Sequence, residues 1–82
     1  MATKFYVGLD LGQAQDYTAI VVQEKTDERY KVRWLERPAL GTKYPVIVDR
    51  VKEILSSPAI RGARLVIDQT GCGRPVFDMF EK

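Results

Sequence analysis

The chain has 82 residues, enough for one small domain, and 45% of them are hydrophobic, as in an ordinary globular protein. The net charge of +2 permits nucleic-acid binding but is weaker than in most free-standing DNA-binding domains. The lack of histidine excludes histidine-based zinc sites and Ser-His triads, and the single cysteine excludes an intrachain disulfide. Because no apolar stretch approaches about 20 residues and no signal peptide is recognisable, we expect a cytoplasmic protein without a membrane span.

The first half of the chain has the pattern of three strands joined by short turns. Residues 4–10 are mostly apolar, residues 17–24 are rich in β-branched side chains, and residues 29–37 alternate between apolar and charged side chains. The short turns predict an antiparallel meander with the third strand at an edge of the sheet. The alternation in the third strand places one set of side chains on a common face: Tyr30, Val32 and Trp34.

The second half has the pattern of a helix, a strand and a second helix. Apolar side chains at helical spacing predict a helix over 44–57, with Pro45 in its first turn. A strand over 63–68 follows, and Pro75 is well placed to open another helix. Because the helix over 44–57 is a crossover, the fourth strand should lie parallel to the first. The sequence therefore predicts an α/β fold with the order β-β-β-α-β-α and the sheet order 3-2-1-4.

Two aspartates, Asp10 and Asp68, each end an apolar run just before a glycine-containing segment. In the predicted sheet they end neighbouring parallel strands, so both carboxylates lie at the carboxyl edge, where open α/β sheets bind ligands. Two adjacent carboxylates repel each other unless a cation is present, and Mg²⁺ or Mn²⁺ accepts such oxygen ligands. We therefore expect a divalent metal site; the alternative is that both aspartates merely cap turns.

Two neighbouring features have weaker signals. Asp16 precedes the second strand and is either an auxiliary metal ligand or, as is commoner for Asp, a turn cap. The segment with Gly71, Gly73 and Arg74 is a glycine loop entering a helix, which suits a phosphate of a nucleic-acid backbone or a tight turn without a ligand. Cys72 is expected to be structural. Four cations form a mild basic group that is either solvated or faces DNA: Lys31, Arg33, Arg37 and Lys43.

Three stretches of the sequence resemble the ribonuclease H-like superfamily, and most closely the nuclease domain of large terminase subunits from tailed phages and prophages. They are Gly8-Leu9-Asp10-Leu11-Gly12, the run from Asp16 to Val22, and the run from Val66 to Asp78. The resemblance covers the front half of such a domain, so residues 1–82 are expected to form a single, truncated ribonuclease H-like domain. A further acidic ligand would follow a fifth strand beyond this region.

The resemblance implies a metal-dependent endonuclease that cuts double-stranded DNA during genome packaging. By it, Asp10 and Asp68 are catalytic ligands of Mg²⁺ or Mn²⁺, and the partners are the remaining terminase segments or the capsid portal. Activity of these residues alone is not expected. Two alternatives stay open: a fragment of an actin-like or sugar-kinase-type ATPase, and a catalytically inert prophage remnant. The fourth strand would leave an open edge, at which we expect self-association.

Overall fold

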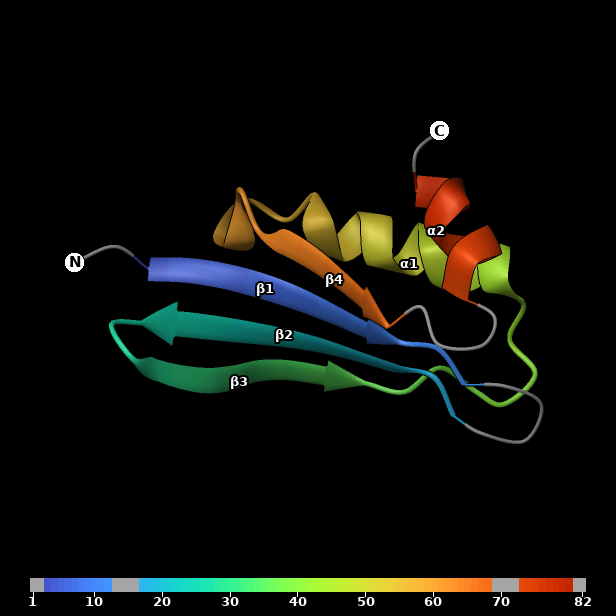
Figure 1. Cartoon of the computed structure of the whole chain (residues 1–82), viewed down its shortest axis with the longest axis horizontal. Coiled ribbons are helices and arrows are strands. Elements are labelled where there is room, and N and C mark those ends of the chain that lie inside the picture. Colours follow the sequence, from blue (N-terminus) through green and yellow to red (C-terminus); the bar gives the residue numbers. More distant parts are fainter. Residues whose placement is uncertain (1–2, 13–16, 69–72, 81–82) are drawn as a thin grey trace.

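The computed structural model describes residues 3–12, 17–68 and 73–80, which form a four-stranded mixed sheet with α1 packed along one side (Figure 1). The elements follow in the predicted order. They are β1 (Thr3–Asp10), β2 (Ala19–Thr26), β3 (Arg29–Glu36), α1 (Tyr44–Leu55), η1 (Pro58–Ile60), β4 (Arg64–Asp68) and α2 (Gly73–Phe80), where η1 is a short 3₁₀ helix.

The sheet has the order β3-β2-β1-β4, as the sequence predicts. β2 runs antiparallel to both β1 and β3, and β4 runs parallel to β1 after the crossover through α1. The element boundaries differ from the predicted ones by a few residues. The second strand begins and ends two residues later, at Ala19 and Thr26. The first helix ends at Leu55, because Ser56 takes the C-cap position and Pro58 opens η1.

The prediction that Trp34 shares a face of β3 with Tyr30 and Val32 is wrong. The pairing of β2 with β3 shifts between Val22 and Gln23, so that Val22 pairs with Trp34 while Gln23 pairs with Val32. The extra residue in β3 is Arg33, and a bulge of this kind reverses the alternation of the side chains that follow it. Because Val22 is buried under the helices, Trp34 lies on the helix side of the sheet rather than beside Val32.

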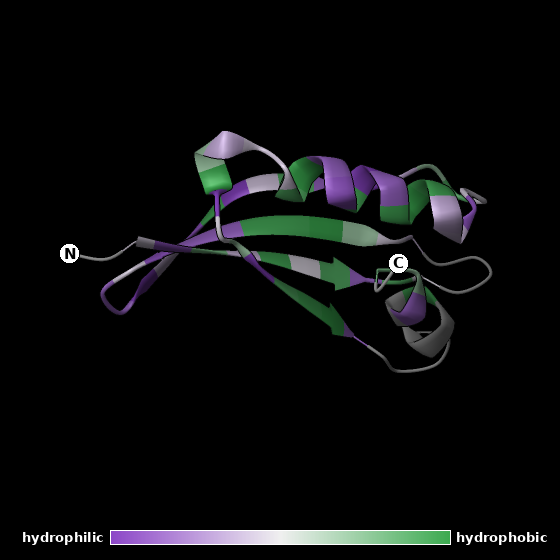
Figure 2. Cartoon of the chain, turned by 90° about the horizontal axis from the view of Figure 1, so that it is seen from above, coloured by the Kyte–Doolittle hydropathy of each residue, from purple (hydrophilic) through white to green (hydrophobic). Residues whose placement is uncertain are grey.

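The core lies between the helices and one face of the sheet. Figure 2 shows the hydrophobic residues concentrated where α1 lies along the strands, and hydrophilic residues toward the β2–β3 turn. The amphipathic pattern predicted for the first helix is confirmed, since its apolar stripe is buried and Asp49, Lys52 and Glu53 are exposed. Full burial of one aliphatic side chain of this stripe stabilises the fold by roughly 1.5–3 kcal/mol. The buried hydrophobic residues are Val7, Leu9, Leu11, Ile20, Val22, Ile47, Val48, Val51, Ile60 and Val76.

The opposite face of the sheet carries exposed side chains, and we call it the open face. Val7 and Leu9 point into the core, so the alternating residues Tyr6, Gly8 and Asp10 lie on the open face. β4 follows the same rule, because Leu65 packs against the core and its neighbours are exposed. The open face therefore carries both the predicted carboxylate pair and several exposed apolar residues.

Candidate functional site

Asp10 and Asp68 lie side by side at the carboxyl edge of the sheet. Each is the last residue of its strand, and the two are direct register partners in the parallel pairing of β1 with β4. Register partners in neighbouring strands point to the same face, and the strands lie about 4.8 Å apart. Both side chains are exposed and belong to the open face. The predicted convergence of the two residues at one edge is thus confirmed at the level of strand register.

Gly12, two residues after Asp10, takes part in two hydrogen bonds with other parts of the chain. The backbone N–H of Gly12 donates to Thr18 Oγ1 at 3.1 Å, and the Tyr44 hydroxyl donates to the Gly12 carbonyl at 3.2 Å. Thr18 is buried, as is Leu11, which lies directly after Asp10. These contacts hold the backbone directly after Asp10, where β1 ends.

A cavity of about 420 Å³ adjoins the chain at Gly12 and Thr18. Gly12 and Thr18 line it from one side, and the residues that lead into α1 line it from the other, including Lys43 at the helix N-cap. Met79 of α2 also contributes to its wall. The roles of Thr18 and Tyr44 in this region have no signal in the sequence, since their contacts with Gly12 depend on tertiary packing around the end of β1.

The donor set of the carboxylate pair suits one hard divalent cation. Two exposed carboxylates on adjacent strands repel each other, and a cation between them removes that repulsion. Mg²⁺ typically binds through one or two carboxylates and retains several water ligands, so two carboxylates are sufficient for partial coordination. Among residues 3–12, 17–68 and 73–80, no cluster of three or more potential metal ligands occurs. In the described part of the chain, Asp10 and Asp68 are therefore not joined by a third acidic or cysteine ligand.

The other residues predicted for the site are described only in part. Asp16 and Gly71 lie outside the described residues, so their predicted roles stay predictions. Gly73 and Arg74 are the first two residues of α2, which confirms that the glycine-containing segment leads directly into a helix. Their predicted contact with a phosphate stays a prediction. The predicted opening of this helix near Pro75 is correct to within two residues.

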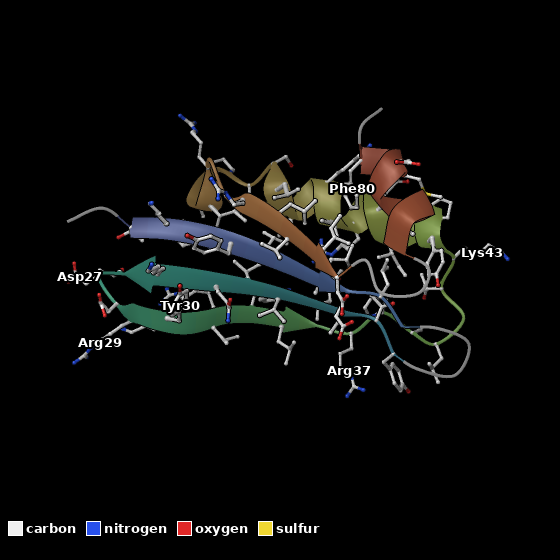
Figure 3. All side chains as sticks on the ribbon, in the orientation of Figure 1. Asp27, Arg29, Tyr30, Arg37, Lys43 and Phe80 are labelled. Atoms are coloured by element: carbon white, nitrogen blue, oxygen red, sulfur yellow. The ribbon has the colours of Figure 1, made fainter. Side chains whose placement is uncertain are left out.

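The cations of the predicted basic group have separate environments. Arg33 Nε lies 3.8 Å from Glu24 Oε1, and the Arg37 guanidinium carbon lies 4.4 Å from the centre of the Tyr17 ring. Figure 3 shows Arg37 below the end of β3 and Lys43 at the far right of the view, with their side chains pointing in different directions. These cations therefore do not form one continuous patch, although Arg37 and Lys43 both follow the carboxyl end of β3 along the chain.

Glu36 has a structural role for which the sequence carries no signal. It pairs with Ile20 on the helix side of the sheet. There it accepts two hydrogen bonds from Arg50 of α1 and one from the Trp34 indole N–H. The hydrogen bonds from Arg50 are the main cause of a lowered Glu36 pKa. Arg50 also contacts Glu53, and its own pKa is raised by the two carboxylates.

Both outer strands of the sheet, β3 and β4, have one neighbouring strand. Among the described residues, no strand pairs with the outer side of β4, as the sequence predicts. Self-association through this edge stays a prediction. None of the helices in the described part of the chain has the length and apolar character needed to cross a bilayer. Comparison of the chain with protein-family models, with curated proteins and with solved structures finds no match.

Proposed function

We propose that this chain contributes the first two metal ligands of a ribonuclease H-like DNA endonuclease of the terminase-nuclease type. The observation that carries the proposal is the direct register of Asp10 with Asp68 at the carboxyl ends of two parallel strands. The sheet order 3-2-1-4 and the crossover helix agree with the fold that the sequence resemblance implies. The proposed substrate is double-stranded DNA, with genome packaging as the setting and other terminase segments or the portal as partners.

In this proposal, Asp10 and Asp68 would be ligands of a Mg²⁺ or Mn²⁺ ion. Such an ion would supply an activated water and would neutralise charge on the phosphate oxygens. The buried neighbours Leu9 and Leu11 hold the backbone on both sides of Asp10, and two hydrogen bonds hold the backbone at Gly12. Since both carboxylates are exposed on the open face, a DNA backbone has access to them without any rearrangement of the core.

Nicking of supercoiled plasmid, measured beside ATP hydrolysis, tests this function. With Mn²⁺ or Mg²⁺ present, the proposal expects nicking by a chain that contains these residues together with its remaining acidic ligands, and no ATP hydrolysis. Asp10→Asn and Asp68→Asn should each abolish nicking and leave the far-ultraviolet circular dichroism unchanged. Asp49→Asn is the matched control, because Asp49 is exposed on α1 and lies outside the pair.

The outcomes separate the proposal from the two alternatives left open by the sequence. ATP hydrolysis that depends on Asp10, without nicking, would contradict the nuclease and favour the actin-like or sugar-kinase class. Nicking that survives both asparagine substitutions would show that the cleavage has another source. If the complete chain is folded and neither activity is present, the catalytic proposal fails and the inert alternative replaces it.

A further inference from the structure

The open face has a second set of chemistry-bearing residues at the end of the sheet away from Asp10. Tyr6 of β1 is the register partner of Arg64 in β4, and Lys4 is the register partner of Lys25 in β2. Lys25 in turn pairs with Tyr30 of β3. Since register partners share a face, these five residues from four strands lie on one surface. We call this set the tyrosine–cation surface.

The centre of the tyrosine–cation surface is an aromatic pair. The ring centres of Tyr6 and Tyr30 lie 6.5 Å apart with their planes tilted by 46°. The Lys25 ammonium lies 5.4 Å from the centre of the Tyr30 ring, so a cation is held beside the pair. Tyr30 is 58% exposed, and Figure 3 shows it on the sheet near the β2–β3 turn. A cavity of about 270 Å³ adjoins both rings and is lined by Tyr6, Gly8, Gln23, Tyr30 and Val66.

A second cavity adjoins the first and is rich in cations. It also has a volume of about 270 Å³ and shares Tyr6 as a lining residue. Lys4, Arg61 and Arg64 contribute to its wall. Of the described residues that line these two cavities, none is acidic. A cavity lined by two tyrosines and a cavity lined by three cations therefore share Tyr6 as a wall residue.

We propose that the tyrosine–cation surface binds single-stranded nucleic acid. An unpaired base enters the cavity that adjoins the Tyr6–Tyr30 pair and contacts these rings from one side, while the adjacent phosphate lies in the cavity with Lys4, Arg61 and Arg64. Aromatic rings next to backbone-tracking cations are the usual means of binding unpaired nucleotides. The Gln23 amide supplies a hydrogen-bonding group at the wall of the base cavity.

The charge and shape of the surface favour this occupant over a second copy of the chain. Three cations around one cavity repel an identical set on a partner, whereas a polyanion neutralises them. In duplex DNA the base faces are stacked on one another, so the Tyr6–Tyr30 pair cannot stack on them. A protein that makes such contacts binds single strands with little preference for sequence.

The surface is also placed to serve the carboxylate pair. Tyr6 and Asp10 lie on the same face of β1 and are four residues apart, which corresponds to about 13 Å along the strand. A single strand that runs along β1 from Tyr6, such as an unpaired segment of the double-stranded substrate, therefore leads toward Asp10 and Asp68. This part of the inference rests on the proposed nuclease function, while binding at the tyrosine–cation surface does not.

Fluorescence anisotropy with a labelled oligothymidylate, measured in EDTA, tests the binding site alone. The proposal expects binding of the single strand, with Tyr30→Ala weakening it at least about fivefold, as for loss of one stacked base. Tyr30→Phe should bind as the natural chain does, because stacking does not need the hydroxyl. Trp34→Ala is the matched control, since Trp34 is an exposed aromatic residue on the same strand but on the helix side. It should leave the affinity unchanged.

The salt dependence of binding tests the cationic cavity. Arg64→Ala should lower the slope of log affinity against log salt concentration by about 0.7, the value for one phosphate contact with a single strand. Arg33→Ala is the matched control and should leave the slope unchanged, because Arg33 is directed toward Glu24. Oligouridylate and a duplex of the same length complete the set; the RNA should bind through the same residues, and the duplex should bind more weakly.

Several results would overturn the inference. One is binding that Tyr30→Ala leaves intact, or that Trp34→Ala weakens equally. Another is tighter binding of the duplex than of the single strand. A third is the absence of oligonucleotide binding together with self-association that Tyr30→Ala abolishes, which would assign the surface to a second copy of the chain. Because the measurement is made without metal, a failure of plasmid nicking does not affect its outcome.

Discussion

Arg50 of α1 binds both carboxylate oxygens of Glu36 at the end of β3. Its Nε and Nη2 atoms each lie 2.7 Å from one oxygen, and the Trp34 indole nitrogen lies 3.1 Å from Glu36 Oε1. This two-point contact connects the crossover helix to the outermost strand of the sheet. Every residue of β3 before Glu36 is exposed, so the contact is an important link between β3 and the helix layer.

Removal of the Arg50 side chain should destabilise the domain. We expect Arg50→Ala to lower the free energy of unfolding, because a two-point contact between a guanidinium and a carboxylate is stronger than a single-point surface ion pair. Urea unfolding followed by circular dichroism measures the change. Glu53→Gln is the control and should cost less, since Glu53 is exposed and contacts only the Nη1 side of Arg50. Equal costs for the two variants would contradict the assigned role of Glu36.

The same pair predicts a pH dependence of stability. The pKa of Glu36 is lowered from its ordinary value of 4.5, chiefly by the hydrogen bonds from Arg50. A carboxyl group whose pKa is lower in the folded state stabilises the fold above its unfolded pKa, and this contribution is lost as the pH falls through the folded value. The difference in unfolding free energy between the natural chain and Glu36→Gln should therefore be present at pH 7 and shrink below pH 4.5. If this difference stays constant with pH, the ionisation of Glu36 does not stabilise the fold.

The position of Trp34 gives an optical test of its contact with Glu36. Trp34 is the single tryptophan of the chain, and its indole N–H donates to Glu36. Protonation of Glu36 should therefore change the tryptophan emission as the pH falls, and Glu36→Gln should remove this change. Tyr30→Phe on the open face should have no effect on it. If the pH-dependent emission survives in Glu36→Gln, Trp34 does not contact this carboxylate.

The element order could be predicted because each element has a local signal in the sequence. The apolar stripe predicted α1, and Pro75 predicted the opening of α2. The face of Trp34 could not be predicted in this way. A repeat of two residues carries no sign of an inserted residue, and the bulge at Arg33 appears only when β3 is paired with β2.

The same distinction holds for the two candidate sites. The register of Asp10 with Asp68 follows from a crossover connection that makes β4 parallel to β1, so the sequence pattern was sufficient to predict it. The Tyr6–Tyr30 pair depends on the register of three strands at once, and Arg50 reaches Glu36 only for one rotation of α1 against the sheet. Neither relationship has a signal in any single stretch of the sequence.

Paramagnetic broadening by Mn²⁺ in the ¹H–¹⁵N spectrum of the chain tests the central claim most directly. Because Mn²⁺ broadens only nearby nuclei, the account predicts selective loss of the Asp10 and Asp68 amide signals and their immediate neighbours at low metal concentration. An Asp10→Ala/Asp68→Ala double variant should lose this selectivity, whereas Asp49→Ala should retain it. If Mn²⁺ leaves the two aspartate signals unchanged, or broadens the double variant in the same way, the aspartate pair does not hold a metal ion.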